Sequence, residues 1–181
     1  SERAAEYYAN GNAKLREKMG ARADVYGTAT LREIDPAAPV LGEPGSADVV
    51  LTFRNVHNWV MDGNEAAMFK AFFDVLAPGG VLGVVEHRAA AGKTLEEVKD
   101  SGYLPEDYVI GLATAAGFVL EEKSEVNANP ADTKDHPNGV WTLPPSGNHP
   151  ESERAKYAAM GESDRMTLRF VKPAADAAPA Q

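Results

Sequence analysis

Residues 47–89 contain a complete strand–helix–strand unit, which constrains the fold more than any other part of the chain. Two short apolar runs, Val49–Phe53 and Val81–Val85, are rich in β-branched residues and do not alternate with polar ones. This is typical of parallel strands that are covered on both faces. Between them, apolar side chains recur at three- and four-residue spacing and form one helix face, at Met68, Phe69, Phe72, Phe73 and Leu76. The pattern predicts an α/β fold with a parallel sheet.

Each of these two predicted strands ends in a cluster of polar side chains. The clusters are Arg54, Asn55, His57, Asn58 and Trp59 after the first strand, and Glu86, His87 and Arg88 after the second. Parallel strands joined by a right-handed crossover present their carboxyl ends at one edge of the sheet, where open α/β folds bind ligands. We therefore expect both clusters to face one crevice.

The unit resembles the fourth and fifth strands of the class I S-adenosylmethionine-dependent methyltransferases. Leu76-Ala77-Pro78-Gly79-Gly80 is similar to their Leu-x-Pro-Gly-Gly turn, and Phe53-Arg54-Asn55-Val56 to the end of their fourth strand in the quinone-biosynthesis branch. The strings at 132–137 and 139–145 further resemble a bacterial family of predicted methyltransferases. The resemblance implies a Rossmann-like three-layer sandwich, with a mostly parallel sheet and an antiparallel last strand, in the strand order three-two-one-four-five-seven-six.

The rest of the chain can be assigned within this scheme. The expected helices cover residues 2–19 and 107–116, and the expected third, sixth and seventh strands cover residues 23–31, 118–126 and 165–172. Residues 1–173 would then form a partial methyltransferase domain, and the Ala- and Pro-rich residues 174–181 a disordered tail.

One expected motif is missing. No glycine-rich loop follows a strand, although such a loop holds the cofactor in the resembling family. The chain also starts at Ser1, in helix-like sequence. We therefore expect a carboxyl-terminal part of a longer protein, truncated at the amino terminus and lacking the first strand, first helix and second strand.

Composition excludes several classes of partner. The formal net charge of −9 opposes the basic surface that nucleic-acid binding requires. The absence of cysteine excludes disulfides, thiolate metal sites and cysteine nucleophiles. No apolar run approaches the roughly 20 residues of a membrane span. The compartment stays open, because any signal peptide would lie upstream of Ser1.

The resemblance assigns the first polar cluster to the cofactor, S-adenosylmethionine. Phe53, Arg54, Asn55 and Val56 would lie beside its methionine portion, with backbone groups and the Asn55 amide as contacts. In the alternative, Asn55 caps a turn and Arg54 pairs with a surface carboxylate.

Catalytic candidates lie at both strand ends. His57 could take a proton from a methyl acceptor, and Glu86 and His87 stand where the family places acceptor-facing residues. Alternatively, His57 is buried against a backbone carbonyl, and Glu86 forms an ion pair with Arg88 or Arg54. No histidine spacing typical of a metal site occurs, so no catalytic metal is expected.

Residues 127–164 are too long for an ordinary connection, since structureless loops beyond about 15 residues are usually functional or disordered. A short helix is expected over residues 151–160. We expect this excursion to fold over the crevice and build the acceptor pocket; in the alternative it is a solvated loop with Trp141 in the core. The candidate substrate-binding residues are Trp59, Arg88, Asp132, Lys134, Asp135, His136 and Trp141.

The function expected from these features is methyl transfer from S-adenosylmethionine to a small-molecule acceptor. A non-catalytic Rossmann-like binding or structural domain and a nicotinamide-dependent oxidoreductase are the alternatives. The Pro-Gly-Gly turn and the antiparallel last strand favour the methyltransferase over the oxidoreductase.

The missing loop leads to a first prediction. The 181-residue chain alone should bind S-adenosylmethionine weakly or not at all, whereas the full-length protein should bind it. Titration calorimetry on both proteins measures the difference. Tight binding by the 181-residue chain would show that the glycine-rich loop is not required.

Overall fold

The computed structural model describes the backbone of residues 2–174 and the side chains of residues 9–174. The chain divides into two compact units, Ser1–Glu33 and Ile34–Gln181. Apart from residue 174, the predicted tail lies outside the described residues.

The first unit is helical. The helix predicted for residues 2–19 is confirmed as α1 (Glu2–Ala21), and an ion pair of 2.8 Å between Arg16 and Glu33 ties the end of the unit to it. The strand predicted for residues 23–31 is wrong: this segment forms the short helix α2 (Ala23–Tyr26) and then turns. A strand needs a neighbour to bond its N–H and C=O groups, and no described strand pairs with this segment.

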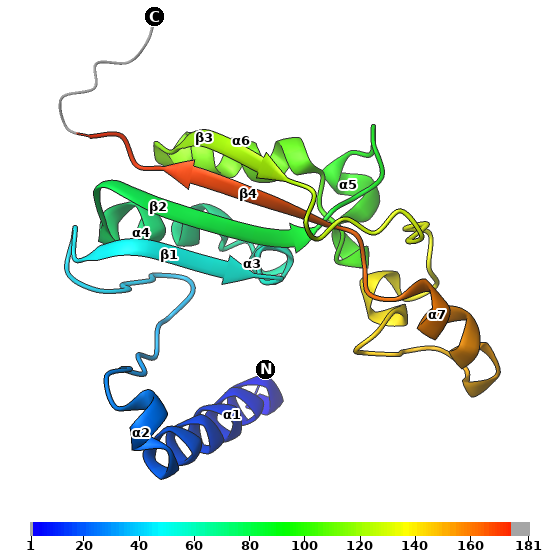
Figure 1. Ribbon diagram of the computed structural model, residues 1–181, viewed down its shortest axis with the longest axis horizontal. Helices are drawn as coiled ribbons and strands as arrows, with labels where there is room; N and C mark the ends of the chain where they lie inside the picture. The colour runs from blue at the N-terminus through cyan, green and yellow to red at the C-terminus, as the bar shows by residue number, and fades with distance from the viewer. Residues whose placement is uncertain (1, 175–181) are drawn as a thin grey trace, which may run out of the picture. The chain divides into compact units, whose positions relative to one another are not determined.

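The second unit is built on a four-stranded sheet. Its strands are β1 (Ala47–Phe53), β2 (Leu76–His87), β3 (Val119–Ser124) and β4 (Arg165–Val171), in the order β1-β2-β4-β3 (Figure 1). β1 and β2 are parallel, and β4 is antiparallel to both of its neighbours. This confirms the predicted α/β fold, its antiparallel last strand and the four-five-seven-six part of the strand order.

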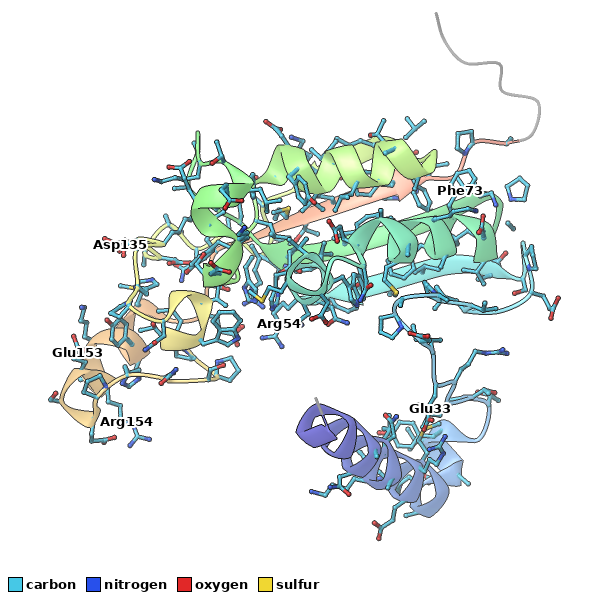
Figure 2. The ribbon with its side chains drawn as sticks, turned by 180° about the vertical axis from the view of Figure 1, so that it is seen from behind. Glu33, Arg54, Phe73, Asp135, Glu153 and Arg154 are labelled. Carbon is cyan, nitrogen blue, oxygen red and sulfur yellow. The ribbon has the colours of Figure 1, made fainter. Side chains whose placement is uncertain are left out.

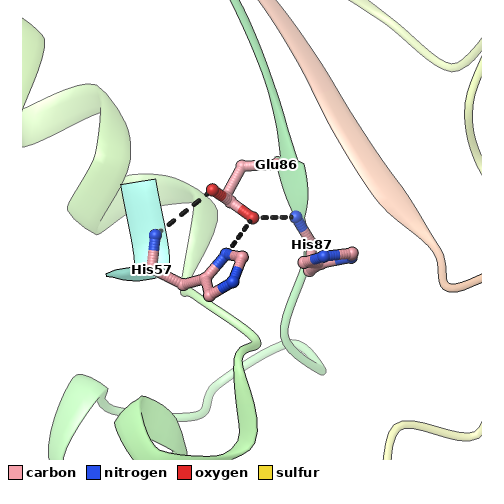
Figure 3. Close-up of side chains that lie close together, drawn as sticks. All are labelled: His57, Glu86 and His87. Atoms are coloured by element: carbon pink, nitrogen blue, oxygen red, sulfur yellow. Dashed lines mark hydrogen bonds and ion pairs between the residues drawn. The ribbon is translucent and has the colours of Figure 1, made fainter. Parts of the chain in front are cut away.

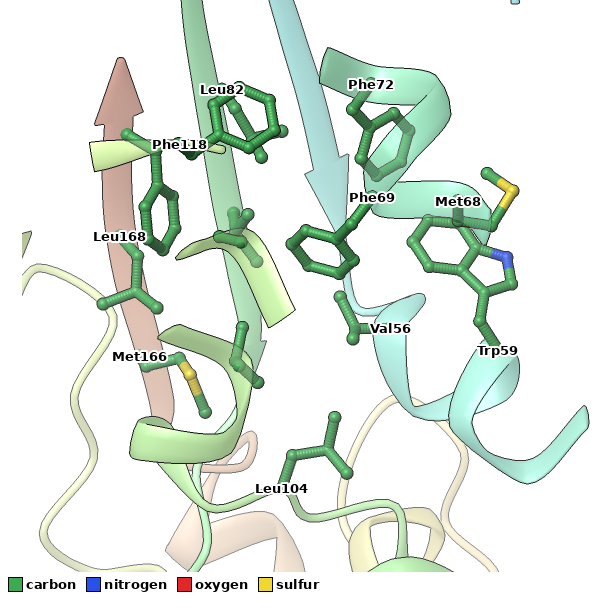
Figure 4. Packing of buried hydrophobic residues seen from close by; sticks show 14 of the residues in the cluster. Val56, Trp59, Met68, Phe69, Phe72, Leu82, Leu104, Phe118, Met166 and Leu168 are labelled. Carbon is green, nitrogen blue, oxygen red and sulfur yellow. The ribbon is translucent and has the colours of Figure 1, made fainter. Parts of the chain in front are cut away.

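Three helices cover one face of the sheet: α3 (Val56–Asp62), α4 (Glu65–Val75) and α6 (Glu106–Ala116) (Figure 1). Their apolar faces meet alternate residues of the strands in one core, part of which Figure 4 shows. The labelled core residues are Val56, Trp59, Met68, Phe69, Phe72, Leu82, Leu104, Phe118, Met166 and Leu168.

The opposite face of the sheet is open within residues 34–174. Val49, Leu51 and Phe53 of β1 point to this face and are 55–60% exposed. Of the three layers expected, residues 34–174 supply the sheet and one helical layer.

The remaining short helices lie at the end of the sheet where β1 and β2 finish (Figure 1). The link after β2 contains α5 (Leu95–Val98) and the 3-10 helix η1 (Lys99–Ser101). The excursion between β3 and β4 contains two 3-10 helices, η2 (Gly139–Thr142) and η3 (Glu151–Glu153), and the helix α7 (Arg154–Met160). Thus η3 and α7 confirm the short helix predicted for residues 151–160.

The second prediction concerns the stability that buried core side chains provide, and a buried and an exposed valine test it. Val84→Ala removes two methyl groups from a side chain with 0% exposure and should lower the free energy of unfolding by about 2–3 kcal/mol. Val126→Ala, at a position 77% exposed, should change it by less than about 0.5 kcal/mol. Urea unfolding measures both variants, and equal losses would contradict the burial of Val84 beneath the helices.

Candidate functional site

Two strand ends and one helix start bring His57, Glu86 and His87 together. Side chains alternate along β2, so Glu86 points to the same face as Leu82 and Val84, beneath the helices. His57 stands in the first turn of α3, directly above that face. All three side chains are buried, and the Glu86 side chain has no exposed surface.

The Glu86 carboxylate is bonded by three N–H groups (Figure 3). The His57 backbone N–H donates to Oε2 at 3.2 Å, and the His87 backbone N–H donates to Oε1 at 2.8 Å. The His57 ring nitrogen Nδ1 lies 2.9 Å from Oε1. The alternative in which Glu86 forms an ion pair with Arg88 or Arg54 is therefore wrong, since these N–H groups meet the hydrogen-bonding need of the buried carboxylate instead.

This contact sets the chemistry available to His57. A carboxylate can only accept hydrogen bonds, so Nδ1 of His57 carries a proton, and in the neutral imidazole the lone pair lies on Nε2. In Figure 3, Nε2 points away from Glu86. The alternative of a histidine bonded to a backbone carbonyl is wrong as well. The geometry is that of an oriented general base.

His87 is held differently. Its Nδ1 lies 2.6 Å from the Ser163 hydroxyl, and its ring centroid lies 5.2 Å from that of His57. Burial lowers the pKa of His87 to about 4, although the neighbouring Glu86 partly opposes the shift. His87 is thus neutral at physiological pH.

A cavity of about 260 Å³ opens beside both histidines. Its lining residues are Phe53, Arg54, His57, Asn58, His87, Val140, Trp141, Pro144, Pro145 and Ser146. The Trp141 ring meets the His57 ring edge-on, with 5.9 Å between centroids. The excursion therefore closes one side of the crevice at the carboxyl edge of β1 and β2, as predicted. The Trp141 side chain is only partly buried and lines the cavity.

Arg54 lies on the rim of this cavity where β1 turns into α3, and Asn55 follows it directly in the chain. Both are exposed. Arg54 has a φ of 53°, in the left-handed region that non-glycine residues rarely adopt. The Asn55 side-chain oxygen accepts a hydrogen bond of 3.0 Å from Asn58, while its nitrogen has no partner among side chains 9–174. Asn55 therefore keeps two donors for a ligand, whereas the Val56 side chain is buried in the core.

Asp132 and His136 are turned away from this cavity into a buried network. The Asp132 carboxylate accepts hydrogen bonds from the Tyr103 hydroxyl at 2.9 Å and from the Asp164 backbone N–H at 2.7 Å, and it lies 2.8 Å from His136 Nε2. Burial next to this carboxylate raises the pKa of the Tyr103 phenol well above its usual value. The network anchors both ends of the excursion.

Asp164 links this network to two cations. Arg88 and Lys134 lie 3.0 Å and 2.6 Å from its carboxylate. Burial alone would raise the pKa of Asp164, but the hydrogen bonds from Arg88 and Lys134 outweigh it and bring the pKa to about 2. Arg88 is also paired with Glu125 at 2.7 Å.

The other candidate acceptor residues do not line the cavity beside His57. Trp59 is buried in the core against Phe72, with 5.5 Å between ring centroids. Arg88 and Lys134 line a separate hollow with Glu106 and Asp107. Asp135 is exposed on the outer side of the excursion, away from Arg54 (Figure 2). Of the seven candidates, only Trp141 lines the cavity beside His57.

The buried triad is the group in the described residues that could hold a metal ion. One ligand atom from each of His57, Glu86 and His87 lies within 4.8 Å of the others. However, three N–H groups already surround the Glu86 carboxylate, and Ser163 holds one nitrogen of His87.

Sequence reasoning missed Ser163 and Tyr103, which bond to His87 and Asp132. A signal for Ser163 was present: it lies two residues before the antiparallel last strand, whose start pairs with the end of β2 at His87 and Arg165. Tyr103 had no such signal, because its position depends on the irregular link after β2.

Comparisons with known proteins identify the fold. No family model matches the sequence, and no curated protein matches it. Three solved structures with this fold are a candidate sarcosine dimethylglycine methyltransferase from Galdieria sulphuraria (TM-score 0.58, 14% identity), the 4+2 cyclase SpnF (0.54, 17%) and a SAM-dependent methyltransferase from Methanosarcina mazei (0.51, 12%).

The alignments cover 88%, 86% and 78% of this chain, respectively, and 65%, 61% and 66% of the three neighbours. The chain thus spans less than two thirds of the length of each. At these identities the comparison shows the fold shared by S-adenosylmethionine-dependent methyltransferases. One neighbour is named as a cyclase, so the fold alone does not define the reaction.

The depressed pKa of His87 gives a third prediction. In the unfolded chain a histidine takes up a proton near pH 6.5, whereas folded His87 does so only near pH 4. The unfolded state therefore binds more protons between these values, and the stability present above pH 6.5 should fall by about 3 kcal/mol as the pH drops to 4.

His87→Gln should remove this part of the pH dependence while keeping a group that can bond to Ser163. His149→Gln, at a histidine outside the buried triad, is the matched control. Urea unfolding between pH 4 and 7.5 measures all three proteins. Identical pH profiles for the wild-type protein and His87→Gln would show that His87 is not the titrating group.

Proposed function

We propose that this protein transfers a methyl group from S-adenosylmethionine to a small-molecule acceptor. The observation that carries the proposal is the crevice at the carboxyl edge of β1 and β2, where an oriented His57–Glu86 pair faces a cavity closed by the excursion. This edge is where open α/β folds bind their ligands, and the fold is one found in S-adenosylmethionine-dependent methyltransferases.

The rim at the end of β1 fits the methionine portion of that cofactor. Its carboxylate needs hydrogen-bond donors, and the Asn55 side-chain nitrogen is an exposed donor without a partner among side chains 9–174. Arg54 and Val56 would contribute backbone groups, and Phe53, which is 60% exposed, an apolar contact. When bound, S-adenosylmethionine supplies a methyl group already activated by its sulfonium.

The chain's own residues would position the acceptor and remove its proton. Glu86 holds His57 in one tautomer and one orientation, so that Nε2 can accept a proton from an acceptor hydroxyl or amine. Neutral His87 forms the adjoining wall without adding a charge. Trp141 and the segment 144–146 keep the acceptor on the His57 side of the cavity. Alignment of the reacting atoms would supply much of the rate.

The partner classes follow from charge and from the cavity. A net charge of −9 disfavours nucleic acid, and a cavity of about 260 Å³ suits a small molecule. Among the described residues, no helix combines the length and the apolar character needed to cross a membrane.

A non-catalytic domain and an oxidoreductase are the alternatives to exclude. An oxidoreductase would bind a nicotinamide cofactor, and a non-catalytic relative would not need an oriented general base. Calorimetry on the full-length protein with S-adenosylmethionine and with NADH tests the oxidoreductase, and an assay of methyl transfer tests the non-catalytic domain. Binding of NADH in place of S-adenosylmethionine would overturn the proposal.

A fourth prediction separates cofactor binding from proton transfer. In the full-length protein, Asn55→Ala should weaken S-adenosylmethionine binding about tenfold, since it removes a hydrogen bond to a charged group. His57→Gln and Glu86→Gln should leave this affinity within about twofold and lower methyl transfer by about 10²-fold or more, because they remove the base or its orientation.

Calorimetry gives the affinities, and transfer of a tritiated methyl group to a panel of hydroxylated small molecules gives the rates. Asn10→Ala is the control for Asn55→Ala, since Asn10 is an exposed asparagine of α1 that does not line the cavity. Equal and small effects of His57→Gln and Glu86→Gln would assign the pair to folding alone.

A further inference from the structure

We propose that Arg54 binds a carboxylate of the methyl acceptor, so that the acceptor is a small carboxylic acid with a hydroxyl or amine that reaches His57. This inference rests on the proposed function and names its substrate class. It assigns the Arg54 side chain to the acceptor and leaves the Arg54 backbone and Asn55 to the cofactor.

The charge of the cavity supports an anionic ligand. Among its ten lining residues are one arginine and two histidines, and no aspartate or glutamate. The chain as a whole has 27 acidic residues against 18 basic ones. In this acidic protein, the cavity has no carboxylate in its lining and has a guanidinium on its rim. An anion would therefore bind more favourably in this cavity than on the acidic remainder of the surface.

Arg54 is also one of the few arginines without an ion pair. Of the eight arginines in the described range 9–174, six form ion pairs with carboxylates, and only Arg54 and Arg32 do not. Arg32 lines neither the cavity beside His57 nor the hollow beside Arg88, whereas Arg54 lines the former. Its fork of N–H donors is therefore available to bind a carboxylate through two parallel hydrogen bonds.

The backbone at Arg54 is consistent with this role. Its φ of 53° costs a non-glycine residue about 1 kcal/mol or more, and such strained residues cluster at ligand sites. Glycine would adopt this φ without cost, so the arginine contributes no conformational advantage at this position. Its side chain is the feature that distinguishes it from glycine.

The size and walls of the cavity limit the acceptor further. A volume of about 260 Å³ lies below the roughly 300–1,000 Å³ typical of sites for drug-sized ligands, so the acceptor is small. Trp141, Phe53 and Pro144 contribute apolar side chains to the lining of the same cavity. An acid with a short apolar or aromatic body between its two polar ends matches this combination of groups.

A carboxylate at Arg54 could also come from the cofactor's methionine portion, so the experiment must distinguish the two sources. Benzoate and benzamide serve as probes, because they have nearly the same shape and differ in charge. Tryptophan fluorescence reports their binding to the full-length protein, since Trp141 lines the cavity whereas Trp59, the other tryptophan of residues 1–181, lies in the core. Calorimetry reports the affinity for S-adenosylmethionine separately.

We expect benzoate to bind saturably and at least about tenfold more tightly than benzamide. Arg54→Gln should weaken benzoate binding about tenfold and leave benzamide binding and S-adenosylmethionine binding within about twofold. Arg54→Lys should retain part of the preference for benzoate, because it keeps the charge. Arg154→Gln in α7, at an exposed arginine paired with Glu151, is the matched control and should change nothing.

Three results with the probes would overturn the inference: equal binding of benzoate and benzamide, no benzoate binding up to about 10 mM, or an equal loss of benzoate affinity in Arg54→Gln and Arg154→Gln. A loss of S-adenosylmethionine affinity in Arg54→Gln as large as the loss for benzoate would assign the guanidinium to the cofactor and would also overturn it. Failure of the wild-type protein to bind S-adenosylmethionine would instead contradict the proposed function, while the benzoate result would still report on Arg54.

Discussion

The bonds around the Glu86 carboxylate hold the site together. They join the end of β2, the first turn of α3 and the His57 ring at one buried point. A charged group with no exposed surface is costly unless every oxygen is bonded, so its surroundings have little freedom to move. The same carboxylate that fixes α3 on the sheet also fixes the proton on His57, and therefore stability and chemistry at this edge depend on one interaction.

Local patterns predicted the central fold because each signal involved neighbouring residues. The apolar runs of β1 and β2 and the spacing along α4 lie within one continuous unit, and β4 alternates clearly enough to be recognised. The strand prediction for residues 23–31 was wrong for a physical reason. A β-branched composition favours a strand only where a neighbouring strand pairs with it through hydrogen bonds. α3 was missed because its seven residues are too few for a helical period to stand out.

The site was less predictable than the fold. Strand-end position brought His57, Glu86 and His87 together correctly, since the topology of parallel strands determines which ends meet. The hydrogen-bond partners of these side chains were not predicted. Glu86 bonds to N–H groups of β2 and of the short helix α3, which the sequence pattern did not reveal. Whether residues 132–136 face the cavity or a buried network depends on how an irregular excursion packs. Sequence periodicity carries no information about such packing.

The position of β4 also has a consequence for the order of assembly. β3 does not pair with β2: both bond to β4, which lies between them and comes later in the chain. During synthesis, β3 therefore leaves the ribosome without a partner and stays unpaired until the excursion and Arg165–Val171 have followed. Trp141, which contacts the His57 ring, and Ser163, which bonds to His87, both belong to the excursion between β3 and β4. These contacts therefore also form only after β3 has been synthesised. The crevice would thus acquire its outer wall in the same late step that completes the sheet.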